Sequence, residues 1–123
     1  MTRFLLVEDL LFLAEDTALG PVRDLGLLEV AVVRPRTRLG GAETYPTLEL
    51  KAAALLDSLV RDHPLVDRNK ALGWMTTIVF LDINGVRIEV ASGGAELKRV
   101  AESLACWERR TRTAEVDRSP LLS

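Results

Sequence analysis

The stretch His63-Pro64-Leu65-Val66-Asp67-Arg68-Asn69-Lys70 separates two apolar segments and holds an imidazole, a carboxylate, a carboxamide and an ammonium group. Proline disfavours a helical conformation in the residue before it, so the break between the two segments falls at His63. The polar residues then lie in a turn and on the first turn of the helix that follows. Unpaired backbone N–H groups and the positive end of the helix dipole favour an anion there, so the stretch predicts a phosphate site.

The segments on both sides of this stretch are predicted to be helices. Pro46 and Glu49 suit the opening turn of the first helix. Its apolar residues recur at helical spacing, which places it in the core: Leu48, Ala52, Leu55, Leu56, Leu59 and Val60. The second helix runs from Asn69 to about Asp82 and is apolar on nearly every side after Lys70, so we expect it to be buried.

Further out, the pattern predicts three more helices and one irregular segment. Residues Val7 to Ala18 have one apolar face, and Asp24 is a good N-cap for a short helix that ends near Val33. Arg34 to Tyr45 contains two glycines and no helical period, which indicates a loop or a short hairpin flap. After a short extended piece that includes Val86, Ile88 and Val90, residues Ala95 to about Arg110 form a last amphipathic helix.

The length fits one domain over residues 1–123, and the predicted helices make it all-α, with a helical core of about 5–110 and a polar tail at 111–123. The net charge of −2 gives no footprint for nucleic acid or an anionic membrane surface. One cysteine, Cys106, and one histidine exclude an internal disulfide and a structural zinc site. No apolar run reaches the ~18–20 residues of a membrane span, and no signal peptide is visible, so we expect a cytoplasmic protein.

Several short motifs occur here in the order in which one family has them. His63-Pro64-x-x-Asp67-x-Asn69-Lys70 between two helices resembles the signature of the Fic-type enzymes, and its Asn-Lys form resembles the death-on-curing (Doc) toxins of the Fic/Doc family. The flanking segments resemble the same family in the same order: Val22–Glu29, Arg34-Pro35-Arg36, Gly40-Gly41, Tyr45–Leu48, Lys51-Ala52-Ala53, Phe80-Leu81 and Asn84-Gly85. The resemblance implies a Fic/Doc-like helical bundle with a short flap before the central helix.

The resemblance implies a role for each polar residue of the motif. His63 would be the catalytic base, because a neutral imidazole can accept a hydroxyl proton near neutral pH. Asp67 would hold a magnesium ion that arrives with the nucleotide. Asn69 and Lys70 would bind the phosphates of ATP. The structural alternatives are that His63 caps a helix end and that Asp67 or Asn69 caps the next helix, or that Asp67 pairs with Arg68 or Lys70.

Lys70 distinguishes between two reactions within the family. Most Fic-type enzymes have glycine at this position and transfer AMP, whereas the Doc branch has lysine and is taken to transfer the terminal phosphate. The resemblance therefore implies a protein kinase toxin of a type II toxin–antitoxin module. Its substrate would be a threonine of elongation factor Tu, so that translation stops, and a Phd-type antitoxin would inhibit it. A Fic-type AMP transferase is the third reading, disfavoured by Lys70.

Two positions of the motif depart from the family. Ala71 replaces the usual arginine, and Arg68 stands where a small residue, commonly glycine, is usual. Loss of a phosphate-binding arginine would weaken turnover on the order of 10- to 1,000-fold. If residue 68 were helical, Arg68 would lie beside position 71 and could replace the missing guanidinium, so we include it as a phosphate-binding candidate. The second reading of the chain is accordingly an impaired relative that binds its antitoxin and acts as a co-repressor.

The flap provides a further candidate site. In the family it would lie beside the active site and dock the target segment, which in this chain implicates Arg36, Arg38, Gly40 and Gly41. The alternative is a solvated basic loop.

Overall fold

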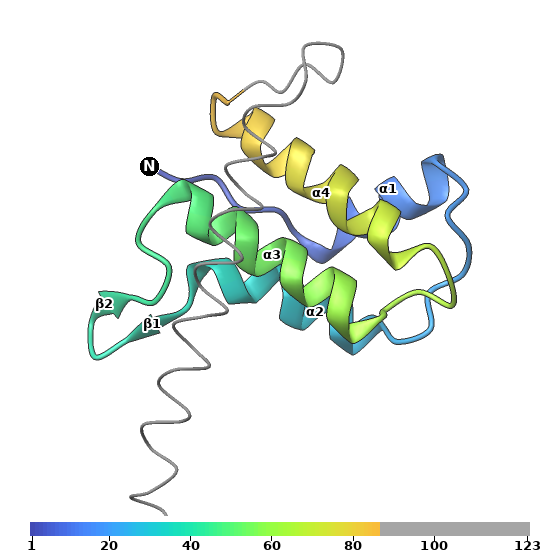
Figure 1. The fold of residues 1–123 in the computed structure, drawn as a ribbon, viewed down its shortest axis with the longest axis horizontal. Coiled ribbons are helices and arrows are strands. Elements are labelled where there is room, and N and C mark those ends of the chain that lie inside the picture. Colours follow the sequence, from blue (N-terminus) through green and yellow to red (C-terminus); the bar gives the residue numbers. More distant parts are fainter. Residues whose placement is uncertain (87–123) are drawn as a thin grey trace, which may run out of the picture.

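The computed structural model describes residues 1–86, which form four α-helices, a short 3₁₀ helix and a small hairpin (Figure 1). The elements are α1 (Val7–Asp16), α2 (Leu25–Val33), η1 (Arg34–Arg36), β1 (Arg38–Leu39), β2 (Ala42–Glu43), α3 (Leu48–Asp62) and α4 (Asn69–Ile83). The predicted all-α class is confirmed. The extended piece after Val86, the helix at Ala95–Arg110, Cys106 and the tail lie outside the described residues.

Helices α3 and α4 form the centre of the described domain, and each packs more extensively against the other than against any other element (Figure 1). Nine consecutive residues of α3, Lys51 to Leu59, are buried. Gly73 of α4 lets the two backbones approach closely, because a Cβ atom there would lie 3.0 Å from Val60 Cγ2 and 3.1 Å from Leu56 Cδ1. Helix α2 and η1 cover α3, and α1 packs against α4 and α2.

Helix α2 begins as the sequence predicts, and α3 begins slightly later than predicted. Asp24 is the N-cap of α2, and its carboxylate accepts a hydrogen bond of 3.4 Å from the Leu27 N–H. The N-cap of α3 is Thr47, whose hydroxyl accepts a 3.1 Å bond from Leu50 N–H. Pro46 therefore precedes the cap and does not occupy the first helical turn.

The expectation that α4 is buried on nearly every side is only partly correct. Its inward face is buried and its flank is partly exposed: Leu72, Gly73, Thr76, Thr77, Phe80 and Leu81 are buried, whereas Trp74, Met75, Ile78 and Val79 are intermediate. The buried face also contains two threonines, so it is not wholly apolar. None of the helices in residues 1–86 has the length and apolar character needed to cross a membrane.

The segment predicted as a flap is a two-stranded antiparallel hairpin, with Arg38 opposite Glu43 and Leu39 opposite Ala42. Gly40 and Gly41 form its turn with φ of 57° and 82°, which a side chain would strain. The hairpin leads into the N-terminal end of α3, and the His63–Lys70 loop leaves the C-terminal end of the same helix (Figure 1).

Candidate functional site

His63 ends α3 in a strained backbone conformation. It is the C-cap residue, with φ of 53° and ψ of 60°, in the left-handed region that disfavours side chains. The next residue is Pro64, which favours an extended conformation at His63. His63 keeps this unfavourable conformation although the residue is exposed and not packed in the core. The hydrogen bonds around it must therefore impose the conformation.

Asn69, the first residue of α4, holds the loop together from inside. It is only 6% exposed. Its Oδ1 accepts a 2.8 Å bond from Leu65 N–H, and its Nδ2 donates to the Leu65 carbonyl oxygen at 3.1 Å. Its side chain thus neither caps α4 nor remains open for a phosphate oxygen. Only its backbone N–H keeps the predicted phosphate-binding role.

The same carboxamide also contacts the imidazole. Because Leu65 N–H can only donate, the oxygen of Asn69 must face Leu65, and Nδ2 then lies 3.3 Å from His63 Nδ1. In this arrangement Nδ1 accepts the bond, and the neutral ring carries its proton on Nε2. The imidazole therefore faces Asn69 and does not cap the carbonyl end of α3.

A second segment, Pro21–Asp24, braces the loop from outside. The backbone N–H groups of Arg23 and Asp24 donate to the Pro64 carbonyl at 2.7 and 3.0 Å, and Val66 N–H donates to the Pro21 carbonyl at 3.1 Å. An isolated antiparallel bridge joins Val22 to Leu65. The loop is thus attached along its length before α4 begins.

Asp67 and Arg68 lie at the outer side of the loop, and both are exposed. Asp67 Oδ1 accepts a 2.7 Å bond from Arg68 N–H, and the N-cap of α4 is Arg68, so Asp67 is not the cap. Within residues 1–86 no salt bridge joins Asp67 to Arg68 or Lys70. Described residues also provide no group of three or more metal-binding side chains. A single carboxylate of this kind fits a metal ion that is also held by phosphate oxygens.

Arg68 has φ of 63° and ψ of 32°, so its backbone is left-handed and not helical. The hypothesis that Arg68 and Ala71 share a helical face is therefore wrong, because its premise was a helical residue 68. The left-handed conformation also gives a physical reason for the glycine that is common there in the family.

Lys70 is exposed on the first turn of α4, where a cation opposes the helix dipole. The first intrahelical bond of α4 runs from Leu72 N–H to the Arg68 carbonyl at 3.2 Å. The N–H groups of Asn69, Lys70 and Ala71 precede this bond and so have no intrahelical acceptor. Lys70 and these N–H groups lie at one helix end, where the sequence predicts them.

The flap residues lie far from this loop. Helix α3 has 15 residues, or roughly 22 Å at 1.5 Å per residue, and separates the hairpin from His63. Arg36, Arg38, Gly40 and Gly41 thus lie toward the N-terminal end of α3, whereas His63 ends the same helix (Figure 1), and their role in docking a target stays a prediction. Arg38 donates to the Gly41 carbonyl at 2.6 Å, and Arg36 lies over the Phe4 ring at 6.0 Å.

Sequence reasoning missed a buried polar cluster between the hairpin and α3. Arg34 Nη1 donates to Asp57 Oδ2 at 2.7 Å and to Ser58 Oγ at 2.9 Å, and Arg34 Nε donates to Tyr45 Oη at 2.9 Å. Burial alone would lower the pKa of Arg34, but its bonds to Asp57 and Tyr45 outweigh burial and raise it. Lys51 Nζ bonds the Tyr45 carbonyl and pairs with Glu43 at 3.1 Å. The signal in the sequence that could have revealed this cluster was a lysine and an aspartate within the apolar segment that forms α3.

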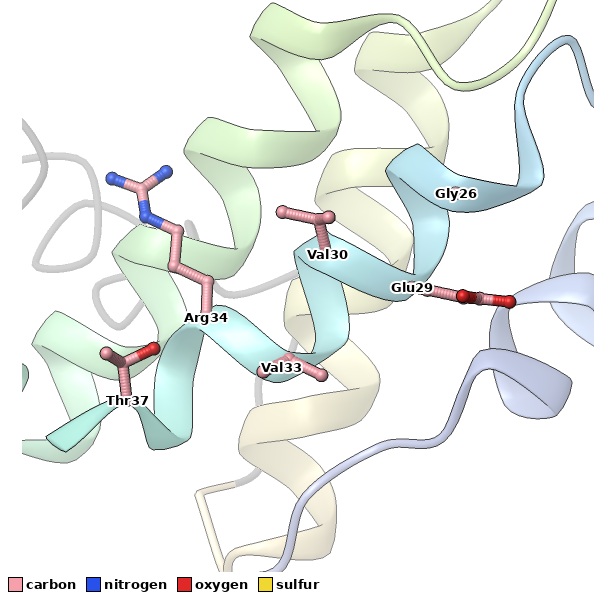
Figure 2. A pocket seen from close by; sticks show the side chains of 6 residues that line it. All are labelled: Gly26, Glu29, Val30, Val33, Arg34 and Thr37. Carbon is pink, nitrogen blue, oxygen red and sulfur yellow. The ribbon is translucent and has the colours of Figure 1, made fainter.

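A groove of about 550 Å³ lies beside α2, next to this cluster. Figure 2 shows its lining residues, with Arg34 extending from the end of α2 toward α3: Gly26, Glu29, Val30, Val33, Arg34 and Thr37. No residue of the His63–Lys70 loop lines it.

Comparison with known proteins agrees with the motif. The model of the Fic/DOC family matches residues 3–81, which include the whole His63–Lys70 loop. A "Toxin Doc" of Mycolicibacterium smegmatis is 41% identical over 130 aligned positions, which cover 92% of this chain and 99% of that protein. No solved structure matches the chain. The chain belongs to the Fic/DOC family.

Proposed function

We propose that this protein is a toxin of a type II toxin–antitoxin module that transfers the terminal phosphate of ATP to a protein hydroxyl. The observation that supports this best is the placement of two groups on one braced loop. His63 is exposed where α3 ends, and Lys70 is exposed where α4 begins, with Asn69 and Pro21–Asp24 fixing the backbone between them. The similarity to a protein named "Toxin Doc" supports the toxin role.

The chemistry assigned to these residues is in-line phosphoryl transfer. The acceptor oxygen bonds the γ-phosphorus, the bond from that phosphorus to the β–γ bridging oxygen breaks, and ADP leaves with the electron pair. His63 takes the hydroxyl proton. Lys70 and the first N–H groups of α4 stabilise the negative charge on the phosphoryl oxygens.

The bond from Asn69 means that the imidazole must change its tautomer before it can act through Nε2. In the arrangement described, Nε2 carries the proton and Nδ1 accepts from Asn69 at 3.3 Å. For Nε2 to accept a proton, the ring must hold its own proton on Nδ1, so the hydrogen bond from Asn69 must break while the left-handed backbone of His63 keeps the ring at the end of α3. A 3.3 Å contact is long for a hydrogen bond, so this change is inexpensive.

Asp67 would hold magnesium together with the phosphates, and the metal would neutralise charge on them. The acceptor, a threonine of elongation factor Tu, and the inhibitory partner, a Phd-type antitoxin, follow from the family resemblance of the motif. We propose the acceptor and the antitoxin from that resemblance alone. Phosphorylation of elongation factor Tu would arrest translation in the cytoplasm.

The decisive experiment is label transfer from ATP to elongation factor Tu in the presence of magnesium. Label from γ-labelled ATP and none from α-labelled ATP is expected for the wild-type protein. His63→Ala should remove the transfer, because the base is lost, and Lys70→Ala should reduce it. Label from the α position would instead support AMP transfer and overturn the proposal.

A second function is favoured by one observation, the alanine at position 71. Ala71 is partly buried against the core and offers no charge to a phosphate. A protein impaired in this way would bind its antitoxin and act as a co-repressor without turnover. Under this reading the wild-type protein transfers no label from either position, and Ala71→Arg restores transfer from γ-labelled ATP.

A further inference from the structure

The Arg23 side chain joins the end of α3 to the segment that braces the loop. Its Nε donates to the His63 carbonyl oxygen at 2.8 Å, and its Nη2 donates to the Asp62 carbonyl oxygen at 2.9 Å. These are carbonyl groups at a helix C-terminus, which have no intrahelical donor. The planar guanidinium fork fits two neighbouring acceptors, and its charge is favourable at this end of the helix dipole.

The position of this fork matters because of the residue it holds. His63 is a non-glycine residue with positive φ followed by proline, and such a conformation persists only when its surroundings determine it. Arg23 fixes the peptide plane that leaves His63, and Asn69 contacts the ring at Nδ1. Without the fork, no hydrogen bond in the described part of the chain holds the His63 carbonyl oxygen, so His63 can relax toward an extended backbone.

We propose that Arg23 is a positioning residue for His63: its guanidinium fixes the left-handed backbone at His63 and so aims the imidazole. This assignment rests on the proposed function for its role in catalysis. In the structure Asp24 caps α2, whereas the Arg23 side chain contacts the end of α3.

The test compares Arg23→Ala and Arg23→Lys with the wild-type full chain. Arg23→Ala removes both side-chain bonds but leaves the backbone bonds from residues 23 and 24 to Pro64, so the loop stays attached. Arg3→Ala is the matched control, because Arg3 is an exposed arginine beside Asn84, at the opposite end of α4. His63 is the only histidine of the chain, so its ring signals are unambiguous in an NMR spectrum.

The first readout is the nuclear Overhauser cross-peak between the Asn69 side-chain amide protons and the His63 ring. We expect Arg23→Ala to lose this cross-peak at a temperature where the spectrum shows a folded domain, and Arg3→Ala to keep it. Arg23→Lys should recover part of it, because one ammonium can reach a carbonyl but lacks the planar fork. A cross-peak of wild-type intensity in Arg23→Ala would overturn the proposal.

The second readout is label transfer from γ-labelled ATP. Arg23→Ala should lower kcat about 10- to 100-fold while KM for ATP stays within about 3-fold, since misplaced catalytic groups cost rate more than binding. A rise in KM with an intact cross-peak would mean that Arg23 acts on the nucleotide, which overturns the positioning role. If the wild-type protein transfers no label, the proposed function fails, and the cross-peak alone decides whether Arg23 positions His63.

Discussion

At the residue scale, the motif is defined by backbone strain as much as by side-chain chemistry. Three non-glycine residues in the described part of the chain have positive φ, and two of them, His63 and Arg68, flank the loop. The sequence predicts a break at His63, because Pro64 follows it. Left-handed backbone at Arg68 could not be foreseen from an arginine, and only the glycine that is common there in the family indicates it.

Replacing Arg68 with glycine should stabilise the protein. A left-handed residue with a Cβ atom costs on the order of 1 kcal/mol, and glycine removes that cost. We expect Arg68→Gly to raise the free energy of unfolding by about 1 kcal/mol in urea denaturation. Glu29→Gly, at an exposed position inside α2, should lower it by about 0.5–1 kcal/mol. A loss of stability in both variants would show that Arg68 is not strained.

Two adjacent threonines in α4 provide a second matched pair. Both are fully buried, but Thr77 Oγ1 donates to the Gly73 carbonyl at 2.7 Å, whereas Thr76 Oγ1 has no hydrogen-bond partner among the described residues. Thr76→Val should therefore raise the free energy of unfolding by about 1 kcal/mol, and Thr77→Val should lower it by about 1 kcal/mol. Thermal unfolding of both variants tests this, and equal shifts of one sign would contradict it.

At the element scale, the helices and the cap of α2 are predictable from the sequence, whereas the caps of α3 and α4 and the tertiary contacts are not. Asp24 and the proline at position 64 mark where α2 begins and α3 ends, because capping and proline geometry act locally. Burial of Lys51, Asp57 and Ser58 in α3 depends on partners elsewhere in the chain. Helical periodicity alone cannot identify those partners.

The ion pair between Arg34 and Asp57 should be a main attachment of η1 to α3. The Arg34 side chain is 20% exposed, and its loss leaves a buried carboxylate with one partner fewer, so Arg34→Ala should cost about 2–3 kcal/mol. Arg61 pairs with the same carboxylate at 2.6 Å but is 55% exposed, so Arg61→Ala should cost about 0–1 kcal/mol. Urea denaturation of the two variants distinguishes them, and equal costs would contradict the central role of Arg34.

At the scale of the whole molecule, α3 separates two polar regions. One is the hairpin with its Arg34 cluster, and the other is the loop from His63 to Lys70 (Figure 1). The motif predicted which residues gather at the second region, because they are close in sequence. The target-docking role of the flap was inferred from the family and stays a prediction, and the structure adds that α3, a helix of 15 residues, lies between the hairpin and His63.

The central claim is that the N-terminal end of α4 binds nucleotide phosphate beside His63. The most direct measurement is a titration of the ¹⁵N-labelled full chain with magnesium and ATP, followed by NMR. The largest shifts are expected at the amides of Asn69, Lys70 and Ala71 and at the His63 ring, with little change in the hairpin, and Lys70→Ala should weaken the binding. Shifts that cluster at Val30 and Val33 in the α2 groove, or no shifts at millimolar ATP, would contradict the claim.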